Sequence, residues 1–374
     1  MFYLAMGISK YSQTLYFQQN GKLINFSLSY SVMAITGSLS FLLSNKMIGI
    51  ELRRVARILG ILYATGMALR VFYQNSFIAI ISGGVAGIGA SILLLVIRKW
   101  IYAEADENPS DKQVLISSRY TLMQITSLIA TLIAGLILFI FSARNEVYVT
   151  ILIVSALAIL FLPTTSIPEN KSIQLEQKES IIALPKNKRI GIGFLLTVIL
   201  MGITTSIVDP IAPAVLRSVG YSVGSTSVVV TILGLVSMLS VFIFQIPLFN
   251  KKPDSYFLLT ELIAGIIIIL CGLENSNPHL WILVAFFVMS IEGTGFFILK
   301  ELVEYDMLPK EEITLYLSLA QSGFLIGNAI GAPLGTLLFQ TMNGQYLLVI
   351  YGLMAIVCGI LYKILATSFT KHRI

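Results

Sequence analysis

Charged residues are scarce in this chain of 374 residues: Asp, Glu, Lys and Arg together make up 12% of it, whereas hydrophobic residues make up 56%. A water-soluble chain of this length would need far more polar surface to cover itself. Long apolar runs recur instead, each close to the roughly 20 residues that a helix needs to cross the hydrocarbon core of a bilayer. The composition therefore indicates a membrane protein and excludes a soluble globular one.

Cysteine and histidine are also scarce, with two residues of each. Cys271 and Cys358 both fall inside apolar runs, so we expect small packing residues rather than a disulfide framework or a metal site. His279 and His372 fall in loops that we expect on opposite sides of the membrane, where they cannot act together. Because the sequence also contains no nucleophile triad and no phosphate-binding loop, we expect no enzyme, no ATP-driven pump and no cofactor.

The apolar runs predict an all-α membrane protein with twelve transmembrane helices. The runs lie near residues 1–18, 26–44, 55–73, 76–97, 117–142, 147–165, 190–213, 224–248, 256–273, 280–299, 313–340 and 345–367. One polar stretch divides them into six and six; it holds two prolines and alternates acidic residues with lysines, as a solvated linker does. We therefore expect an N-terminal six-helix bundle over residues 1–165, a cytoplasmic linker over 166–189 and a C-terminal six-helix bundle over 190–374.

Lysine and arginine are distributed unevenly between the predicted loops. With a cytoplasmic N-terminus, the inner segments carry twenty of these residues and the outer segments carry four, Lys22, Arg70, Arg144 and Arg217. This excess of positive charge inside predicts a multi-pass protein of the plasma membrane with both termini in the cytoplasm. The net charge of +6 then follows from topology, and we expect no nucleic-acid partner.

The two halves of the chain resemble each other. Residues 6–40 and 201–237 open with MGIS and MGIT, and further on Gly21 aligns with Gly220. Repeated halves are expected of a secondary transporter whose substrate site lies between two similar bundles. The alignment leaves five residues ahead of Met6 but about eleven in the span ahead of its counterpart, so we expect a first helix that is short at its N-terminal end.

Six plus six spans, similar halves and a charged central linker together resemble the major facilitator superfamily. The resemblance covers essentially the whole chain. It implies two bundles that give alternating access to a central cavity, lined mainly by the first, fourth, seventh and tenth helices.

The loop between the second and third helices of that family usually reads Gly-x-x-x-Asp-Arg/Lys-x-Gly-Arg/Lys-Arg/Lys. The corresponding residues here are Asn45, Lys46, Gly49, Arg53 and Arg54. The resemblance implies that they form a loop involved in the conformational change. Asn45 stands where the family has Asp, and the missing charge weakens any latch that this loop would form between the bundles.

Three carboxyl groups fall within predicted spans, and an acid inside a membrane is costly enough to suggest a function. Asp209, beside Pro210 in the seventh span, is a candidate to bind a proton or cation; the alternative is a carboxylate in interfacial water. Glu292 lies twelve residues into the tenth span, roughly 18 Å deep, and is a candidate for proton coupling. Its alternative is a structural ion pair with a basic side chain. Glu261, near the inner end of the ninth span, is expected to reach the cytoplasmic interface.

Lys10 lies within the first span, whereas its repeat counterpart is Thr205, so the fold does not need the charge. We expect a counter-ion to Asp209 or Glu292, or a contact to an anionic group of the substrate; the alternative is a lysine that faces an outer vestibule. The candidates for the substrate cavity are Lys10, Tyr11, Gln13, Gln124, Gln321 and Asn328.

The eleventh span places glycines four residues apart, at Gly323, Gly327, Gly331 and Gly335. Residues at this spacing lie nearly on one face of a helix, where small side chains let a neighbouring backbone approach. We expect a packing surface there rather than a ligand site.

The function predicted by these features is proton-coupled efflux of a small amphipathic organic solute, such as a drug-like compound, a metabolite or a short peptide. The sequence leaves open proton-coupled uptake of a nutrient, such as an oligosaccharide or an organic anion, and a receptor or scaffold that does not transport. We expect a monomer in the lipid bilayer whose partners are the solute and protons.

Overall fold

The computed structural model describes residues 1–45, 52–107, 112–162, 185–244, 246–309 and 312–371. Every secondary-structure element in these ranges is helical, and the chain forms two compact units. The first unit is Met1–Ile181 with Val223–Val228, and the second is Ile182–Ser222 with Val229–Ile374. Most of the predicted linker, 166–189, lies outside the described residues, so the predicted domain boundaries stay a prediction.

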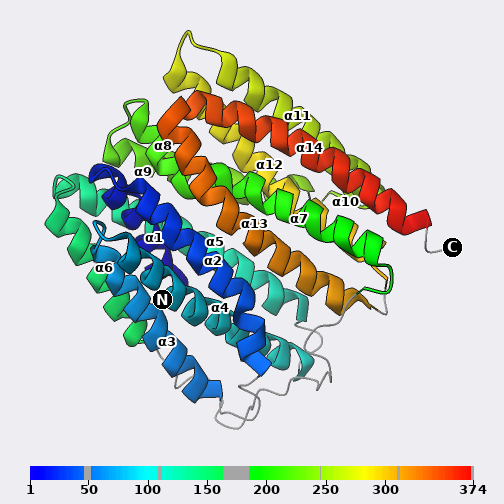
Figure 1. Cartoon of the computed structure of the whole chain (residues 1–374), viewed down its shortest axis with the longest axis horizontal. Helices are drawn as coiled ribbons and strands as arrows, with labels where there is room; N and C mark the ends of the chain where they lie inside the picture. The colour runs from blue at the N-terminus through cyan, green and yellow to red at the C-terminus, as the bar shows by residue number, and fades with distance from the viewer. Residues whose placement is uncertain (46–51, 108–111, 163–184, 245, 310–311, 372–374) are drawn as a thin grey trace. The chain divides into compact units, whose positions relative to one another are not determined.

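The first unit is built from long helices and one short 3-10 helix, η1 (Figure 1). They are α1 (Phe2–Gln19), α2 (Leu23–Asn45), α3 (Leu52–Ala68), η1 (Leu69–Val71), α4 (Ser76–Glu107), α5 (Lys112–Ile140) and α6 (Asn145–Leu160). α2 packs along α4, α3 packs against both α4 and α6, and α1 packs against α5 and α6. Small residues allow the close approach of α3 to α4: a Cβ added to Gly66 would lie 2.6 Å from the backbone nitrogen of Ala86.

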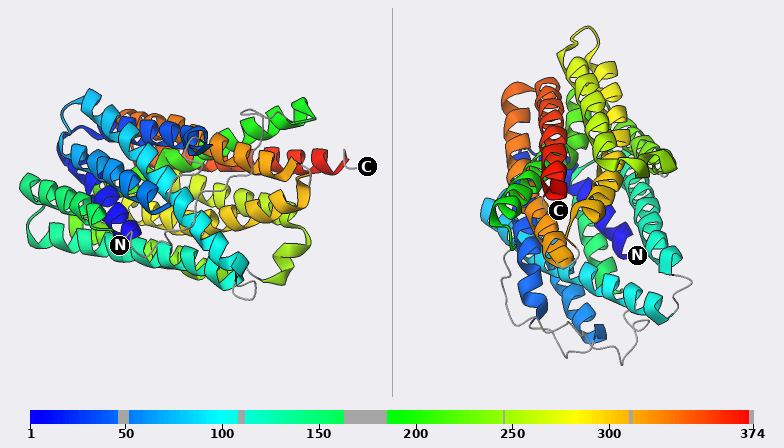
Figure 2. Two further views of the ribbon diagram at one scale, coloured as in Figure 1. Left: turned by 90° about the horizontal axis from the view of Figure 1, so that it is seen from below. Right: turned by 90° about the vertical axis from the view of Figure 1, so that its right-hand side faces the viewer.

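The second unit is also helical (Figures 1 and 2). Its elements are α7 (Lys188–Val208), the 3-10 helix η4 (Asp209–Ile211), α8 (Ala212–Ser218), α9 (Val223–Phe244, whose start is grouped with the first unit), α10 (Pro247–Lys251), α11 (Pro253–Leu273), α12 (Pro278–Met307), α13 (Ile313–Met342) and α14 (Gly344–Lys371). α7 packs along α13, and α11 packs along α14 and against α12. Aromatic side chains such as Phe194, Phe257 and Tyr362 fill the core between these helices.

Seven of the described helices are long and apolar enough to cross a membrane. They are Ser76–Leu94, Lys188–Ser218, Val223–Phe244, Pro253–Leu273, Pro278–Glu304, Leu319–Met342 and Gly344–Phe369. Two shorter apolar helices, Ile125–Ile140 and Asn145–Leu160, accompany them. The count of twelve spans and its division into two sets of six remain predictions.

The helical run that begins with α7 changes character at Asp209. α7 ends at Val208, η4 spans Asp209–Ile211, and α8 continues to Ser218. Pro210 and Pro213 cause the change, because a proline has no amide hydrogen to donate and its ring crowds the preceding turn. The distortion places Asp209 at a break within a transmembrane run.

The internal repeat is visible in the backbone as well as in the sequence. Gly21 follows α1 and Gly220 follows α8, so both end the first helical run of their half. Both have a positive φ, 66° and 99°, a conformation that glycine adopts without steric cost. These two aligned glycines therefore perform the same turn.

Candidate functional site: a buried carboxyl cluster in the second unit

Glu292 lies in the middle of α12 and is 3% exposed. The hydroxyl group of Tyr351, on α14, donates a hydrogen bond of 2.8 Å to Glu292 Oε2, and this contact is buried. Glu292 therefore points into the second unit, toward α14, and its carboxyl group has a fixed neutral partner.

Glu261, on α11, belongs to the same cluster. The sequence predicts that it reaches the cytoplasmic interface, and that prediction is wrong: Glu261 is 1% exposed, and its carboxyl group interacts with that of Glu292. Among the groups that act on these two carboxyls in the described part of the chain, none is a cation. The two acids therefore face each other without a lysine or arginine between them.

Glycines on α11 and α14 explain how Glu261 enters the interior. A Cβ added to Gly265 would lie 2.7 Å from the carbonyl oxygen of Gly352, so the two backbones nearly touch there. Glu261 lies one turn toward the N-terminus of α11 and packs on Gly359. A Cβ added to Gly359 would lie 2.8 Å from the Cβ of Glu261. A larger residue at position 359 would occupy the space through which the Glu261 side chain passes.

Cys358 and Thr204 extend the cluster toward α7. Thr204 Oγ1 lies 3.3 Å from Cys358 Sγ and donates to the carbonyl oxygen of Leu200 at 2.9 Å. Because a hydroxyl group has a single hydrogen, the Cys358 thiol is then the donor to Thr204. Cys358 also lies within electrostatic reach of both buried glutamates, so polar groups from α7, α11, α12 and α14 converge here.

Asp209 connects this cluster to an exposed position. It is exposed, although Val208 and Pro210 on either side of it are buried. It acts electrostatically on both Glu292 and Tyr351. The two acids proposed from the sequence for proton coupling are thus brought together, one accessible and one buried.

Replacing Tyr351 by Phe is expected to destabilise the protein by about 1–3 kcal/mol, because it leaves the buried Glu292 Oε2 without its donor. The measurement is thermal unfolding in a neutral detergent. Tyr346→Phe, on the same helix and 56% exposed, is the matched control and should unfold like the wild type. Equal effects of the two substitutions would show that the hydrogen bond contributes nothing.

Three of the predicted cavity residues lie on α1, in the first unit. Lys10 is exposed, with its Nζ 5.6 Å from the centre of the Tyr30 ring, whereas Tyr11 and Gln13 are buried. The predicted pairing of Lys10 with Asp209 or Glu292 joins residues of different units and stays a prediction.

Arg70 is a residue whose burial the sequence did not reveal. The sequence predicts an outer location for it, and the structure adds that its side chain is only 5% exposed. Its Nη1 donates to Ser9 Oγ at 2.7 Å, and its Nη2 lies 3.8 Å from Met33 Sδ. The only sequence signal was its position between apolar residues in ALRVF.

The family model described as Major Facilitator Superfamily matches residues 1–299 and 194–373. The chain belongs to this superfamily. It is therefore a multi-pass membrane transporter rather than an enzyme. No curated protein matches the sequence.

Solved structures of superfamily transporters are similar over almost the whole chain. The nucleoside transporter NupG is 15% identical with a TM-score of 0.71, covering 99% of this chain and 96% of NupG. A D-xylose-proton symporter is 14% identical with a TM-score of 0.70, covering 96% and 95%. A bacterial homologue of the iron transporter ferroportin, in an inward-facing state, is 13% identical with a TM-score of 0.74, covering 98% and 96%. At these identities the likeness establishes the fold.

Two further candidates for the cavity of this superfamily member lie on α13. Thr205 Oγ1 donates to Asn328 Oδ1 at 3.4 Å, so Asn328 connects α13 to α7, and Gln321 is exposed. The side chain of Gln124 is outside the described residues. Whether these residues contact a solute stays a prediction.

The loop that the sequence predicts to take part in the conformational change is described only at its ends. Asn45 is the last residue of α2, and Lys46 and Gly49 lie outside the described residues. Arg53 and Arg54 lie in the first turn of α3, where Arg54 is exposed.

The four glycines of α13 all face α7. A Cβ added to Gly323 would lie 3.0 Å from Leu195 Cδ1, and one added to Gly331 would lie 2.5 Å from the carbonyl oxygen of Ile203. Gly327 and Gly335 meet the α7 backbone in the same way, and Gly202 meets α13 from the opposite side. The stripe lets the two helices pack backbone against backbone.

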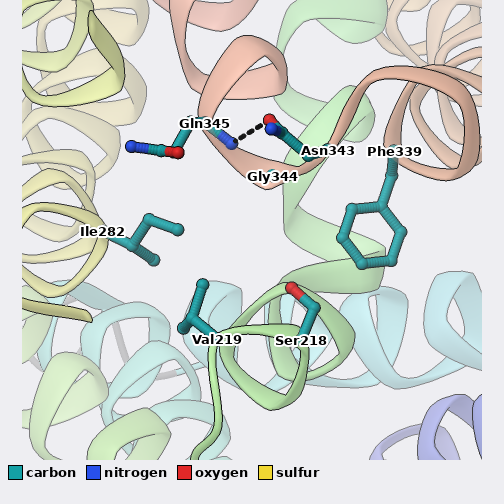
Figure 3. Close-up of a pocket in the computed structure, with 7 residues that line it drawn as sticks. All are labelled: Ser218, Val219, Ile282, Phe339, Asn343, Gly344 and Gln345. Carbon is teal, nitrogen blue, oxygen red and sulfur yellow. Dashed lines mark hydrogen bonds between the residues drawn. The ribbon is translucent and has the colours of Figure 1, made fainter. Parts of the chain in front are cut away.

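A cleft of about 280 Å³ lies where α8 ends, α12 begins and α13 turns into α14 (Figure 3). Its lining residues are Ser218, Val219, Ile282, Phe339, Asn343, Gly344 and Gln345. The backbone nitrogen of Gln345 donates to Asn343 Oδ1 at 3.0 Å, which holds the turn. The lining includes no charged side chain and none of the predicted site residues, so we assign the cleft no role in coupling.

Proposed function

We propose that this protein is a proton-coupled secondary transporter that exports a small amphipathic organic solute by alternating access. The proposal takes the chain as twelve spans in two six-helix bundles, over residues 1–165 and 190–374. It also takes the protein as a monomer in the plasma membrane with both termini in the cytoplasm, in agreement with the distribution of lysine and arginine.

The observation that carries the proposal is the buried pair of Glu261 and Glu292. An acid inside a membrane protein needs either a cation or a proton to balance its charge, and no cation acts on this pair among the described residues. The alternative of a structural ion pair at Glu292 finds no basic partner among the described groups that act on it. We assign the counter-charge to a proton.

The surroundings of the pair suit the binding and release of a proton. Two adjacent carboxylates repel each other in an apolar bundle, whereas one protonated carboxyl can donate a hydrogen bond to the other. Tyr351 donates a hydrogen bond to Glu292, and the exposed Asp209 lies within electrostatic reach. We infer that Asp209 is the accessible end of the proton path and Glu292 the buried end.

The solute class follows from the scarcity of charge in the apolar helices and from the aromatic and amide side chains between them. A sugar carrier would need denser hydrogen-bonding groups. One structurally similar protein is named a D-xylose-proton symporter, which supports proton coupling on this fold but leaves the direction open.

The test is transport by the wild-type protein in liposomes, with a panel of labelled amphipathic solutes and an imposed pH gradient. An exporter that exchanges solute for protons accumulates solute when the liposome interior is more acidic, because protons leave as solute enters. Protein-free liposomes are the control. Accumulation only when the outside is more acidic would replace efflux by proton-coupled uptake, and no accumulation under any gradient would contradict the proposal.

A further inference from the structure

The first unit contains a positive charge for which no counter-ion is found among the described residues. The groups that act on the buried guanidinium of Arg70 are the hydroxyls of Ser9 and Tyr63 and the thioether of Met33, all of them neutral. A buried cation without an anion is destabilising, because its loss of hydration is not repaid. A bound anion would balance such a charge.

The hydrogen bonds of Arg70 leave one edge of its guanidinium incompletely satisfied. Nη1 is held by Ser9 at 2.7 Å, whereas Nε has no well-aligned hydrogen-bond partner and Nη2 has only the weak thioether acceptor of Met33 at 3.8 Å. The buried hydroxyl of Tyr63 also lies within reach of the guanidinium, and as a neutral group it leaves the charge unbalanced. Nε and Nη2 point the same way, and their two hydrogens match the two oxygens of a carboxylate. Met33 is flexible, so an incoming anion can displace it.

Further donors line the path of the Arg70 side chain along α1. Tyr16 donates to the carbonyl oxygen of Val71 at 3.3 Å, so the backbone beside Arg70 lies near Tyr16, while its guanidinium reaches Ser9. Residues at spacings of three, four and seven share one helix face, so Ser12 and Gln13 lie between those two levels. Both are buried, and Ser12 Oγ and Gln13 Nε2 have no hydrogen-bond partner.

The segment that carries Arg70 is held firmly, so the charge is positioned in advance. Besides the bond from Tyr16, Asn25 Nδ2 donates to the carbonyl oxygen of Tyr73 at 2.8 Å. These bonds tie Val71 and Tyr73, in the short segment after α3, to α1 and α2. A fixed guanidinium binds its ligand with less loss of conformational entropy.

Lys10 provides a second positive charge at the exposed side of the same α1–α2 seam. It follows Ser9 in the chain, and its Nζ lies 5.6 Å from the centre of the Tyr30 ring. Tyr30 lies three residues before Met33, almost one turn away on α2. An exposed cation next to a buried one attracts anions toward the buried site.

We propose that Arg70 binds the carboxylate of the transported solute, side-on through Nε and Nη2, with Lys10 at the approach. One buried positive charge matches a monocarboxylate better than a doubly charged phosphate. The inference rests on the proposed function for its claim that this ligand is the cargo, and it narrows the amphipathic solute to an organic acid.

The test compares acids with their neutral amides on the purified full-length protein in a neutral detergent. The probes are benzoate against benzamide, phenylacetate against phenylacetamide, and inorganic phosphate, read as shifts in the thermal unfolding temperature. We expect both acids to stabilise the wild type and neither amide nor phosphate to do so. Equal stabilisation by acids and amides, stabilisation by phosphate like that by the acids, or no stabilisation by either acid would overturn the proposal.

Substitutions at Arg70 locate the effect. Arg70→Lys keeps the charge but loses the paired Nε and Nη2 donors. It should weaken the apparent affinity for the acids about tenfold or more. Arg70→Gln should abolish the stabilisation, and Arg144→Gln, at an exposed arginine in the same unit, should leave it intact. Should Arg70→Gln not fold, Arg70→Lys carries the test. Full affinity in Arg70→Lys would overturn the assignment.

Transport assays separate this inference from the function on which it rests. If a pH gradient drives a neutral solute and neither acid binds, the transporter proposal stands and the carboxylate site is wrong. If the acids bind through Arg70 but no gradient drives any solute, the site stands and proton-coupled transport is wrong.

Discussion

Liposomes that carry Glu292→Gln are expected to lose transport driven by a pH gradient while they keep exchange of solute for solute. Glutamine has nearly the shape of a protonated glutamate and can still accept the hydrogen bond from Tyr351, so the packing between α12 and α14 is kept. It cannot bind and release a proton. Gradient-driven accumulation should fall to the level of protein-free liposomes, because the step that couples protons to the conformational change is gone.

Glu274→Gln is the matched control for this experiment. Glu274 lies between α11 and α12, outside the candidate spans, and is exposed. A hydrogen bond of 3.0 Å from the backbone nitrogen of Ser276 to its Oε1 holds the pKa of Glu274 below its ordinary value, so it stays ionised at neutral pH and transfers no proton there. Transport by this variant should match the wild type. Undiminished gradient-driven transport by Glu292→Gln would remove Glu292 from the coupling step.

Gradient-driven transport and solute-for-solute exchange, measured together, distinguish a loss of coupling from a loss of folding. A variant that is misfolded loses exchange and gradient-driven transport together, whereas a variant that is only uncoupled loses the second alone. In Glu292→Gln, a neutral amide beside a protonated Glu261 would still allow the helices to move, since movement itself needs no net proton transfer. Retained solute-for-solute exchange would therefore show that the loss of gradient-driven transport comes from lost coupling and not from misfolding.

The sequence predicted the class of fold and named Asp209 and Glu292 as candidates, because both steps depend on composition and spacing. Apolar runs identify membrane helices directly, and the repeat aligned Gly21 with Gly220, which indeed make the same turn. An acid in such a run stands out wherever it points. That Glu292 lies far from both ends of its helix could thus be predicted from residue counts alone.

The direction in which a side chain points could not be predicted in the same way. A helix that is apolar on nearly every face gives no periodic signal for which face meets its neighbours. Glu261 was therefore expected at the interface, although the glycines of α11 and α14 bring the helices close enough to enclose it. The burial of Arg70 could not be predicted for the same reason, because only the packing of α1, α2 and α3 decides that its side chain turns inward.

Helix packing also determines the second large effect that we expect, the destabilisation caused by Gly327→Ala. A Cβ at this position would lie 2.8 Å from both Gly202 Cα and the backbone nitrogen of Ile203, and closer still to the carbonyl oxygen of Ile199. These are backbone atoms of α7, which cannot rotate away as a side chain does. α7 and α13 must separate, and overpacking of this kind costs about 3 kcal/mol or more when no side chain can yield.

The matched control is Gly293→Ala, on α12 in the same unit, where an added Cβ meets nothing within 4 Å. Alanine favours a helix over glycine by up to about 1 kcal/mol, so this variant should be as stable as the wild type or slightly more so. Thermal unfolding in neutral detergent measures both. Since the Thr205–Asn328 hydrogen bond joins the same two helices one residue from Gly327, separation of α7 from α13 should break it as well. If Gly327→Ala unfolds at the same temperature as Gly293→Ala, the backbone contact between α7 and α13 is not what holds these helices together.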